Sequence, residues 1–146
     1  MKTNMCSISG ICNFEKKPSI EIVELMTKLL SHRGPDDSGF FQNENVSFGH
    51  NRLSIIDLQN SKQPMKDNLN KNIIIFNGEI YNFKELKSDL QSLGHKFETE
   101  GDTEVVLKSY NQWGIECLKK LEGMFVFCIW DNKKKQLFIG RDKLEK

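Results

Sequence analysis

The chain has 146 residues, which suits one domain that buries roughly two thirds of its unfolded surface. Its net charge of +1 gives no reason to expect nucleic acid or an anionic membrane as a partner. The longest apolar run, residues 124–130, is too short to span a bilayer, and the first residues lack the apolar core of a signal peptide. The four cysteines include no CxxC pair and no tight His/Cys cluster, which predicts reduced thiols, no metal site and a cytoplasmic location.

The first half of the chain predicts strands around one helix. Small and apolar residues alternate from Cys6 to Phe14, as in a strand. Ser19 can cap a helix whose predicted inward face consists of Ile22, Leu25, Met26, Leu29 and Leu30. A loop at residues 32–37 and short strands around residues 39–42 and 46–56 follow.

An apolar strand is predicted over residues 72–76, stopped by Asn77-Gly78. Asn82 and Glu85 have the spacing of a capping box, which opens a helix that Gly94 ends. The inward residues of this helix are predicted to be Leu86, Leu90 and Leu93.

Asp102 or Thr103 is predicted to cap the next helix, whose apolar face would be Val105, Val106, Tyr110 and Trp113. Residues 124–130 are apolar on both faces and predict a central strand covered on each side. A turn at residues 131–134 leads into a strand over residues 136–141. Strands at both ends with helices between them favour an α+β fold with sheets packed in layers.

Cys6 follows Met5 directly and has two interpretations. A small buried strand residue is the common role of an arbitrary cysteine. If Cys6 were the N-terminal residue, its α-amine, with a pKa of about 8, could take the thiol proton and return it to a leaving group.

Three other places could carry chemistry. Asn77-Gly78 is a strong hairpin signal, but no returning strand follows it, so the pair could present two oxyanion donors. Arg52, one of three arginines, is either paired internally or placed to grip a carboxylate. Glu79 and Asp102 could be solvated charges or a helix cap.

A series of motifs then carries a specific resemblance. They occur in the order MCSISGI (5–11), HRGPDDSG (32–39), FGHNRLSIIDL (48–58), QPM (63–65), FNGEIYNFKEL (76–86), GDTEVVL (101–107), LEGMFVFCIWD (121–131) and GRD (140–142). Together they resemble the glutaminase domain of glutamine-hydrolysing asparagine synthetases, a branch of the class II glutamine amidotransferases. The resemblance implies the four-layer αββα sandwich of N-terminal-nucleophile hydrolases.

The resemblance also implies the roles of individual residues. Cys6 corresponds to the nucleophile, and Asn77 and Gly78 correspond to the oxyanion-hole donors. The substrate α-carboxylate would be held by Arg52, and the pocket would be lined by the backbone of Leu53, Ser54, Ile55 and Ile56. Glu79 and Asp102 would hold the α-ammonium group, whereas His32 and His50 are predicted to be structural.

Two departures from the family pattern concern the ends of the chain. Residues 1–5 are expected to be a leader or a misassigned start, because an attached leader would turn the Cys6 nitrogen into an amide. Residues 6–146 are expected to form a partial type 2 glutamine amidotransferase domain, incomplete at its C-terminal end, without the ATP-dependent synthetase domain.

The implied activity is the hydrolysis of glutamine to glutamate and ammonia through a Cys6 γ-glutamyl thioester, for asparagine biosynthesis. The alternatives are a glutaminase that serves another acceptor and a catalytically silent remnant. No cofactor or metal is expected for the glutaminase step, and ATP and Mg²⁺ are implied only for the synthetase domain. The expected partners are glutamine and a synthetase domain or a separate acceptor enzyme; a homodimer is one assembly that the resemblance allows.

Overall fold

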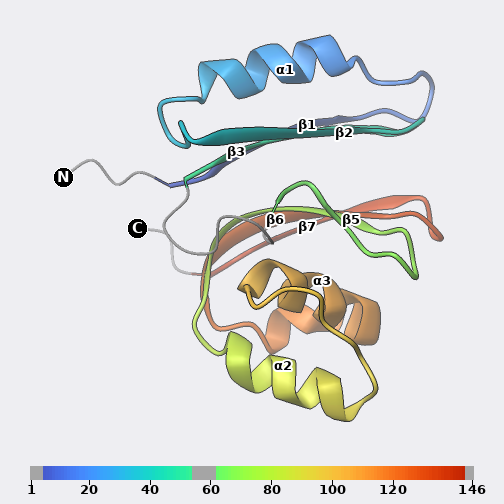
Figure 1. Ribbon diagram of the computed structural model, residues 1–146. Helices are drawn as coiled ribbons and strands as arrows, with labels where there is room; N and C mark the ends of the chain where they lie inside the picture. Colours follow the sequence, from blue (N-terminus) through green and yellow to red (C-terminus); the bar gives the residue numbers. More distant parts are fainter. Residues whose placement is uncertain (1–4, 54–61, 144–146) are drawn as a thin grey trace.

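The computed structural model describes residues 5–53 and 62–143, which form four layers in the order helix, sheet, sheet, helices (Figure 1). In the first sheet, β3 (Val46–Arg52) lies between β1 (Ser7–Cys12) and β2 (Asp37–Gln42) and is antiparallel to both. All seven residues of β3 are buried, because strands flank it on both edges. Helix α1 (Ile20–Leu29) covers the outer face of this sheet.

The predicted inward face of α1 is wrong. Ile22, Leu25 and Leu29 are 52%, 63% and 78% exposed, Met26 and Leu30 are only partly buried, and the residues that α1 buries fully are Val23 and Thr27. The predicted start is confirmed, since the backbone N–H of Ile22 donates to the Ser19 hydroxyl at 3.3 Å.

The surface of the first sheet under α1 is polar and closely approached, which explains this difference. Thr27 Oγ1 and Ser9 Oγ lie 2.7 Å apart in a hydrogen bond. A Cβ atom added to Gly49 would lie 2.1 Å from Thr27 Oγ1, so only glycine permits this approach of helix to strand. Asn51 adds a further contact by donating from Nδ2 to the carbonyl of Thr27 at 2.6 Å.

The second sheet has the order β4 (Met65–Lys66), β5 (Ile73–Ile80), β6 (Gly123–Asp131) and β7 (Gln136–Arg141), with antiparallel neighbours throughout. The predicted central strand is confirmed as β6. The predicted end of the preceding strand at residue 76 is wrong, because β5 runs on to residue 80 and pairs with β6 along its whole length.

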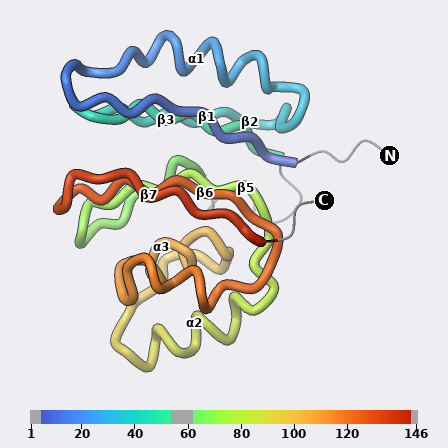
Figure 2. The backbone as a smooth tube through the Cα atoms, turned by 180° about the vertical axis from the view of Figure 1, so that it is seen from behind, coloured from blue at the N-terminus to red at the C-terminus, as the bar shows by residue number. Residues whose placement is uncertain are grey.

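Helices α2 (Phe83–Ser92) and α3 (Asp102–Trp113), with a short 3₁₀ helix at Gly114–Lys119, cover the outer face of the second sheet (Figure 2). Leu86 and Leu90 are buried as predicted, whereas Leu93 is 55% exposed.

The predicted helix caps differ from the structure. The Asn82 side chain makes no capping bond and instead bonds the backbone of residues 120 and 122, so the capping box does not form. The N-cap of α3 is Gly101, so Asp102 and Thr103 lie inside the first turn.

Two apolar cores hold the layers together. The core between the sheets contains Val46, Phe48, Ile73, Ile75 and Trp130. The larger core lies between the second sheet and its helices and includes Ile74, Phe76, Leu90, Val106, Phe127 and Ile129. The expected α+β sandwich with αββα layers is therefore confirmed. Among the described residues, no helix is long and apolar enough to cross a membrane.

Candidate active site

Cys6 and Arg52 lie across from each other at one end of the first sheet. The β1–β3 register pairs Ser7 with Asn51, so the next position along each strand sets Cys6 opposite Arg52. The backbone N–H of Leu53 donates to Cys6 Sγ at 3.5 Å, which fixes this end of β1 to the end of β3.

The side chains of Cys6 and Arg52 face the second sheet. Alternate side chains of a strand share one face. Ile8 on β1 and Phe48 on β3 both pack into the core between the sheets. Cys6 and Arg52 are an even number of positions away from them and therefore point into the same inter-sheet space, where Arg52 is 7% exposed.

Asn77 reaches this space from the opposite sheet. Ile73 and Ile75 of β5 belong to the inter-sheet core, and Asn77 follows them in the same alternation. His50 Nε2 lies 3.2 Å from the Phe76 carbonyl, so the Arg52 end of β3 meets the Asn77 position of β5. The structure thus brings three predicted site residues to one end of the space between the sheets.

The Gly78 N–H lies outside the β5–β6 ladder. Its register partner Phe125 directs its own backbone groups to Asp142, with Phe125 N donating to Oδ2 at 2.7 Å and Phe125 O accepting from Asp142 N at 3.0 Å. Gly78 and Phe125 are consequently a non-hydrogen-bonded pair, and the Gly78 N–H points away from β6. Gly78 has φ +150°, and a Cβ there would lie 2.2 Å from the carbonyl oxygen of Met124, so glycine is required.

Glu79 and Asp102 place two carboxylates beside this end of β5. Asp102 Oδ2 accepts a hydrogen bond from the Ile80 N–H at 3.0 Å, which ties the start of α3 to β5. Burial raises the pKa of Asp102, the bond from Ile80 lowers it, and the negative charge of Glu79 raises it further, leaving it above its ordinary value. A cation bound between the two groups would relieve their repulsion.

His50 has the surroundings of a structural residue, as predicted. It is 1% exposed, and burial lowers its pKa to about 4, with the Phe76 carbonyl opposing and the Arg52 charge reinforcing this shift. A neutral imidazole with so low a pKa is a poor proton acceptor at neutral pH.

Two residues near the site escaped the sequence analysis. Asp37 pairs with Arg52 in the β2–β3 register, which sets a carboxylate across from the guanidinium. Gln63 accepts the Phe76 N–H at 2.6 Å. Both lie inside the motifs HRGPDDSG and QPM, which were the available signal. The predicted pocket residues Ser54, Ile55 and Ile56 lie outside the described residues.

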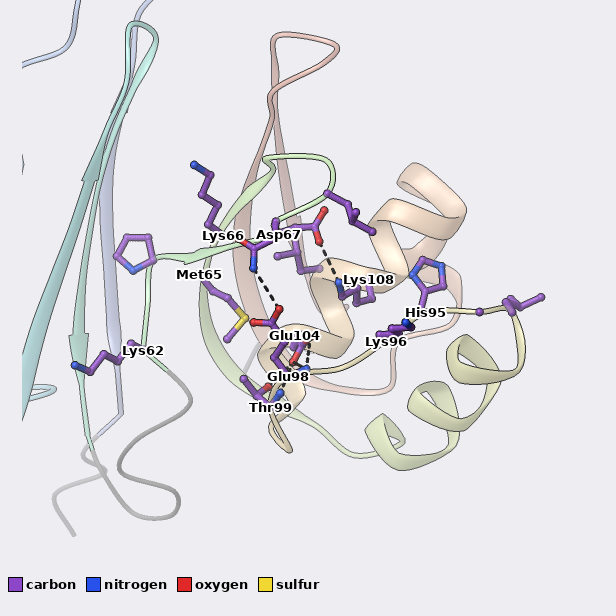
Figure 3. Close-up of a pocket in the computed structure, with 16 residues that line it drawn as sticks. Lys62, Met65, Lys66, Asp67, His95, Lys96, Glu98, Thr99, Glu104 and Lys108 are labelled. Atoms are coloured by element: carbon purple, nitrogen blue, oxygen red, sulfur yellow. Dashed lines mark hydrogen bonds and ion pairs between the residues drawn. The ribbon is translucent and has the colours of Figure 1, made fainter.

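A cavity of about 740 Å³ opens elsewhere, beside β4 and the α2–α3 connection (Figure 3). None of the described site residues lines it. Its buried acids already have protein partners: Glu104 accepts from the backbone of Glu98 and Thr99, and Asp67 accepts from Lys108 at 3.0 Å. The first set of contacts holds the α2–α3 connection to α3, and the second holds α3 to the segment after β4, so both acids are already engaged within the protein.

Comparison with known proteins identifies the family of this domain. The family described as "Glutamine amidotransferase domain" matches residues 5–146. Asparagine synthetase [glutamine-hydrolyzing] 3 of Bacillus subtilis is 42% identical over 144 residues, covering 96% of this chain and 24% of that protein. Asparagine synthetase B [glutamine-hydrolyzing] of Escherichia coli is 37% identical, covering 96% of this chain and 26% of that protein.

The chain therefore spans about a quarter of the length of these curated relatives. A solved structure with the same fold is glutamine phosphoribosylpyrophosphate amidotransferase from Bacillus subtilis, with a TM-score of 0.71, 22% identity, and coverage of 92% of this chain and 37% of that one. With nearly its whole described length matched by the family, and with a cysteine, an arginine and an asparagine meeting between its sheets, the chain belongs to the glutamine amidotransferase domains.

Proposed function

We propose that this domain hydrolyses glutamine to glutamate and ammonia, as the glutaminase part of an asparagine synthetase. The observation that carries the proposal is the meeting of Cys6, Arg52 and Asn77 at one end of the inter-sheet space. The relatives named as glutamine-hydrolysing asparagine synthetases support the assignment of the acceptor.

Both charges at the α-carbon of glutamine have complementary groups in this arrangement. The guanidinium of Arg52 suits the α-carboxylate, which a planar fork can bind through two parallel hydrogen bonds. Glu79 and Asp102 suit the α-ammonium group. Binding both charges fixes the side-chain amide relative to Cys6, which converts the attack into an effectively intramolecular step.

In the proposed reaction, Cys6 Sγ attacks the amide carbon while the thiol proton passes to the α-amine of Cys6. The oxyanion that forms is held by the Asn77 side-chain amide and the Gly78 N–H. Its collapse breaks the C–N bond, and the protonated amine gives its proton to the leaving ammonia. Water then attacks the thioester, releases glutamate and returns the proton to the thiol.

This mechanism requires a free α-amine on Cys6, so the active chain is proposed to begin there. No cofactor takes part in the proposed glutaminase step; ATP and Mg²⁺ would serve a synthetase domain. A cytoplasmic location and a homodimer remain predictions. Formation of asparagine from aspartate, glutamine and ATP by the protein that contains this domain would separate this acceptor from others.

A glutamine analogue with an electrophile at the side-chain end tests the site. We expect it to alkylate Cys6 and spare the other thiols, because burial raises the pKa of Cys117 to about 12 and of Cys128 to about 11, and also raises that of Cys12. Reaction needs the thiolate, which these groups rarely form at neutral pH. Peptide mapping locates the label, and intact mass confirms that Cys6 is the first residue.

Asn77→Ala separates chemistry from binding. This variant is expected to keep labelling of Cys6 while its kcat for glutamine falls by about 10²–10³, because the lost donor acts on the oxyanion. Label spread over several cysteines would support the silent remnant instead. So would the absence of label on a folded protein that begins at Cys6.

A further inference from the structure

Among the described residues, β5 has no strand partner beyond β4 along its edge beside the site. Its neighbour β4 contributes only two residues, and the preceding Pro64 has no N–H to continue the ladder. The β4–β5 register pairs Met65 with Ile74, so the next backbone groups on this edge are those of Phe76, opposite Gln63.

Two side chains provide hydrogen bonds that β4 does not make to this part of β5. The Phe76 N–H donates to Gln63 Oε1 at 2.6 Å, and the Phe76 carbonyl lies 3.2 Å from His50 Nε2. Buried backbone groups need partners, so these bonds replace the ladder hydrogen bonds that β4 does not supply.

These bonds connect the separate segments that carry the site. His50 lies on the first sheet two residues before Arg52, and Phe76 lies on the second sheet directly before Asn77. Gln63 Nε2 also donates to Thr103 Oγ1 at 3.4 Å, next to Asp102 in the first turn of α3.

The main chain confirms that this junction is tight. A Cβ added to Gly39 of β2 would lie 1.9 Å from the Gln63 carbonyl oxygen, and Gly39 is the register partner of His50. Gln63 and His50 therefore approach Phe76 from adjoining positions of one packed junction.

We propose that His50 and Gln63 are positioning residues of the oxyanion hole: His50 fixes the Phe76–Asn77 backbone against β3, which carries Arg52, and Gln63 fixes it against the start of α3, which carries Asp102. The proposal rests on the glutaminase function proposed above. Oxyanion donors act only when their geometry is fixed to within about 0.5 Å, and a misplacement of about 1 Å can cost 10²-fold in rate.

The role demands a particular form of His50. To donate to the Phe76 carbonyl, the ring must carry its proton on Nε2. The charged groups facing the ring are Arg52 and Asp37; burial and the Arg52 charge lower the pKa of His50 and outweigh the opposing effect of Asp37, so the imidazole stays neutral. Long-range ¹H–¹⁵N spectra at neutral pH should show the Nε2–H tautomer, and an Nδ1–H tautomer would overturn the role of His50.

His50→Leu removes the donor, whereas His50→Gln places an amide N–H at a similar reach. We expect His50→Leu to lower kcat for glutamine by about 10-fold to 10²-fold while KM and the rate of Cys6 alkylation stay within about twofold. His50→Gln should restore most of kcat. A purely structural role would lower the fraction of folded protein and leave kcat per folded molecule unchanged.

Gln63→Met tests the second contact and carries the test alone if His50→Leu does not fold. It should show the same selective loss of kcat, because methionine matches the length of glutamine but cannot accept the Phe76 N–H. If the wild type is active and folded Gln63→Met or His50→Leu has the same kcat as the wild type, the positioning role is overturned and the proposed function stands. If the wild type begins at Cys6 and neither hydrolyses glutamine nor takes the label, the proposed function is overturned.

Discussion

At the scale of single residues, the Asp102 carboxylate has a partner in the structure, the Ile80 N–H, and a proposed partner, the substrate ammonium. It accepts the Ile80 N–H at 3.0 Å, and its charge adds to that of Glu79 at the place proposed for the substrate ammonium. The first contact needs only an oxygen atom, whereas the second needs the negative charge. Asparagine at this position separates the two, because it keeps the acceptor and removes the charge.

Asp102→Asn should weaken glutamine binding and remove part of its pH dependence. Because burial and Glu79 hold the pKa of Asp102 above its ordinary value of 3.8, the wild-type carboxylate takes up its proton at a higher pH than usual. Wild-type affinity should therefore fall as pH decreases toward this raised pKa, and the variant should be weak and flat over the same range. Calorimetric titration of glutamine into an inactive Cys6→Ala background measures this without turnover.

Asp102→Ala is the matched variant, because it removes the acceptor as well. We expect it to lose thermal stability, since the Ile80 N–H is left without its partner. Asp102→Asn should be at least as stable as the wild type at neutral pH, because the ionised form is the one that burial disfavours. Equal affinity of wild type and Asp102→Asn would remove Asp102 from the ammonium site.

The predicted site residues came from motifs, and the structure adds their geometry. Cys6, Arg52 and Asn77 could be named from the sequence, since each lies in a motif shared with a known family. Asp37 and Gln63 also lie in such motifs, but a motif gives no contact, and their contacts to Arg52 and Phe76 depend on how segments distant in sequence are brought together. Period-two alternation shows which face a side chain takes only after the strand limits are known.

At the scale of elements, strand β5 shows where local signals fail. Asn77-Gly78 has the sequence of a hairpin turn, yet it continues the strand, because pairing with β6 outweighs the turn preference. Helix α1 shows the opposite error. Ile22, Leu25 and Leu29 are exposed on its outer side, since the sheet beneath it offers hydroxyl and amide partners to Thr27.

The strands and helices with strong periodicity were predictable. Val105, Val106 and Tyr110 of α3 are buried as expected, and β6 is central as its apolar run indicated. The capping box at Asn82 failed because its amide found backbone partners in the segment before β6. Such long-range partners carry no signal in the neighbouring sequence.

The ion pair between Lys108 of α3 and Asp67 after β4 is expected to stabilise the junction of these elements. The Asp67 side chain is 1% exposed and that of Lys108 is 13% exposed. Lys108→Met should lower the free energy of unfolding by about 3 kcal/mol, because it leaves a buried carboxylate without its partner. Urea denaturation at neutral pH measures the loss.

Lys87→Met is the matched control. Lys87 pairs at 2.8 Å with Glu100, whose side chain is 90% exposed, so its loss should cost less than about 1 kcal/mol.

The two variants should also differ in pH dependence. Burial alone would raise the Asp67 pKa, but hydrogen bonds from Asn70 and the Lys108 ammonium hold it below its ordinary 3.8. The stabilisation is full above the unfolded-state pKa and is lost as pH falls through the folded-state value, so the Lys108→Met deficit should shrink in acid. A deficit that is the same at every pH would contradict this account.

At the scale of the whole molecule, the proposed active site is made by both sheets. Cys6 and Arg52 lie on the first sheet, and Asn77 and Gly78 lie on the second. Each sheet has a helical layer on its outer face, and the inner faces of the two sheets lie against each other (Figure 1). A single sheet could not place the proposed nucleophile across from the proposed oxyanion hole.

The order of strands in each sheet has a consequence for folding. Hairpins β2–β3 and β6–β7 join near neighbours, such as Gln42 with Ser47 and Asp131 with Gln136. The pairing of β1 with β3 joins Ser7 to Asn51, across a long stretch of chain. Loop closure makes such non-local pairing slow, and domains rich in it fold in about milliseconds to seconds.

Pulsed hydrogen exchange during refolding should therefore show protection in the β2–β3 and β6–β7 hairpins before β1. Simultaneous protection of β1 and the hairpins would contradict this order. Because Cys6 directly precedes β1, its thiol would reach Arg52 and Asn77 only in the last step. The nascent protein would then acquire its nucleophile after its scaffold, and glutaminase activity would report completed folding more faithfully than helix content does.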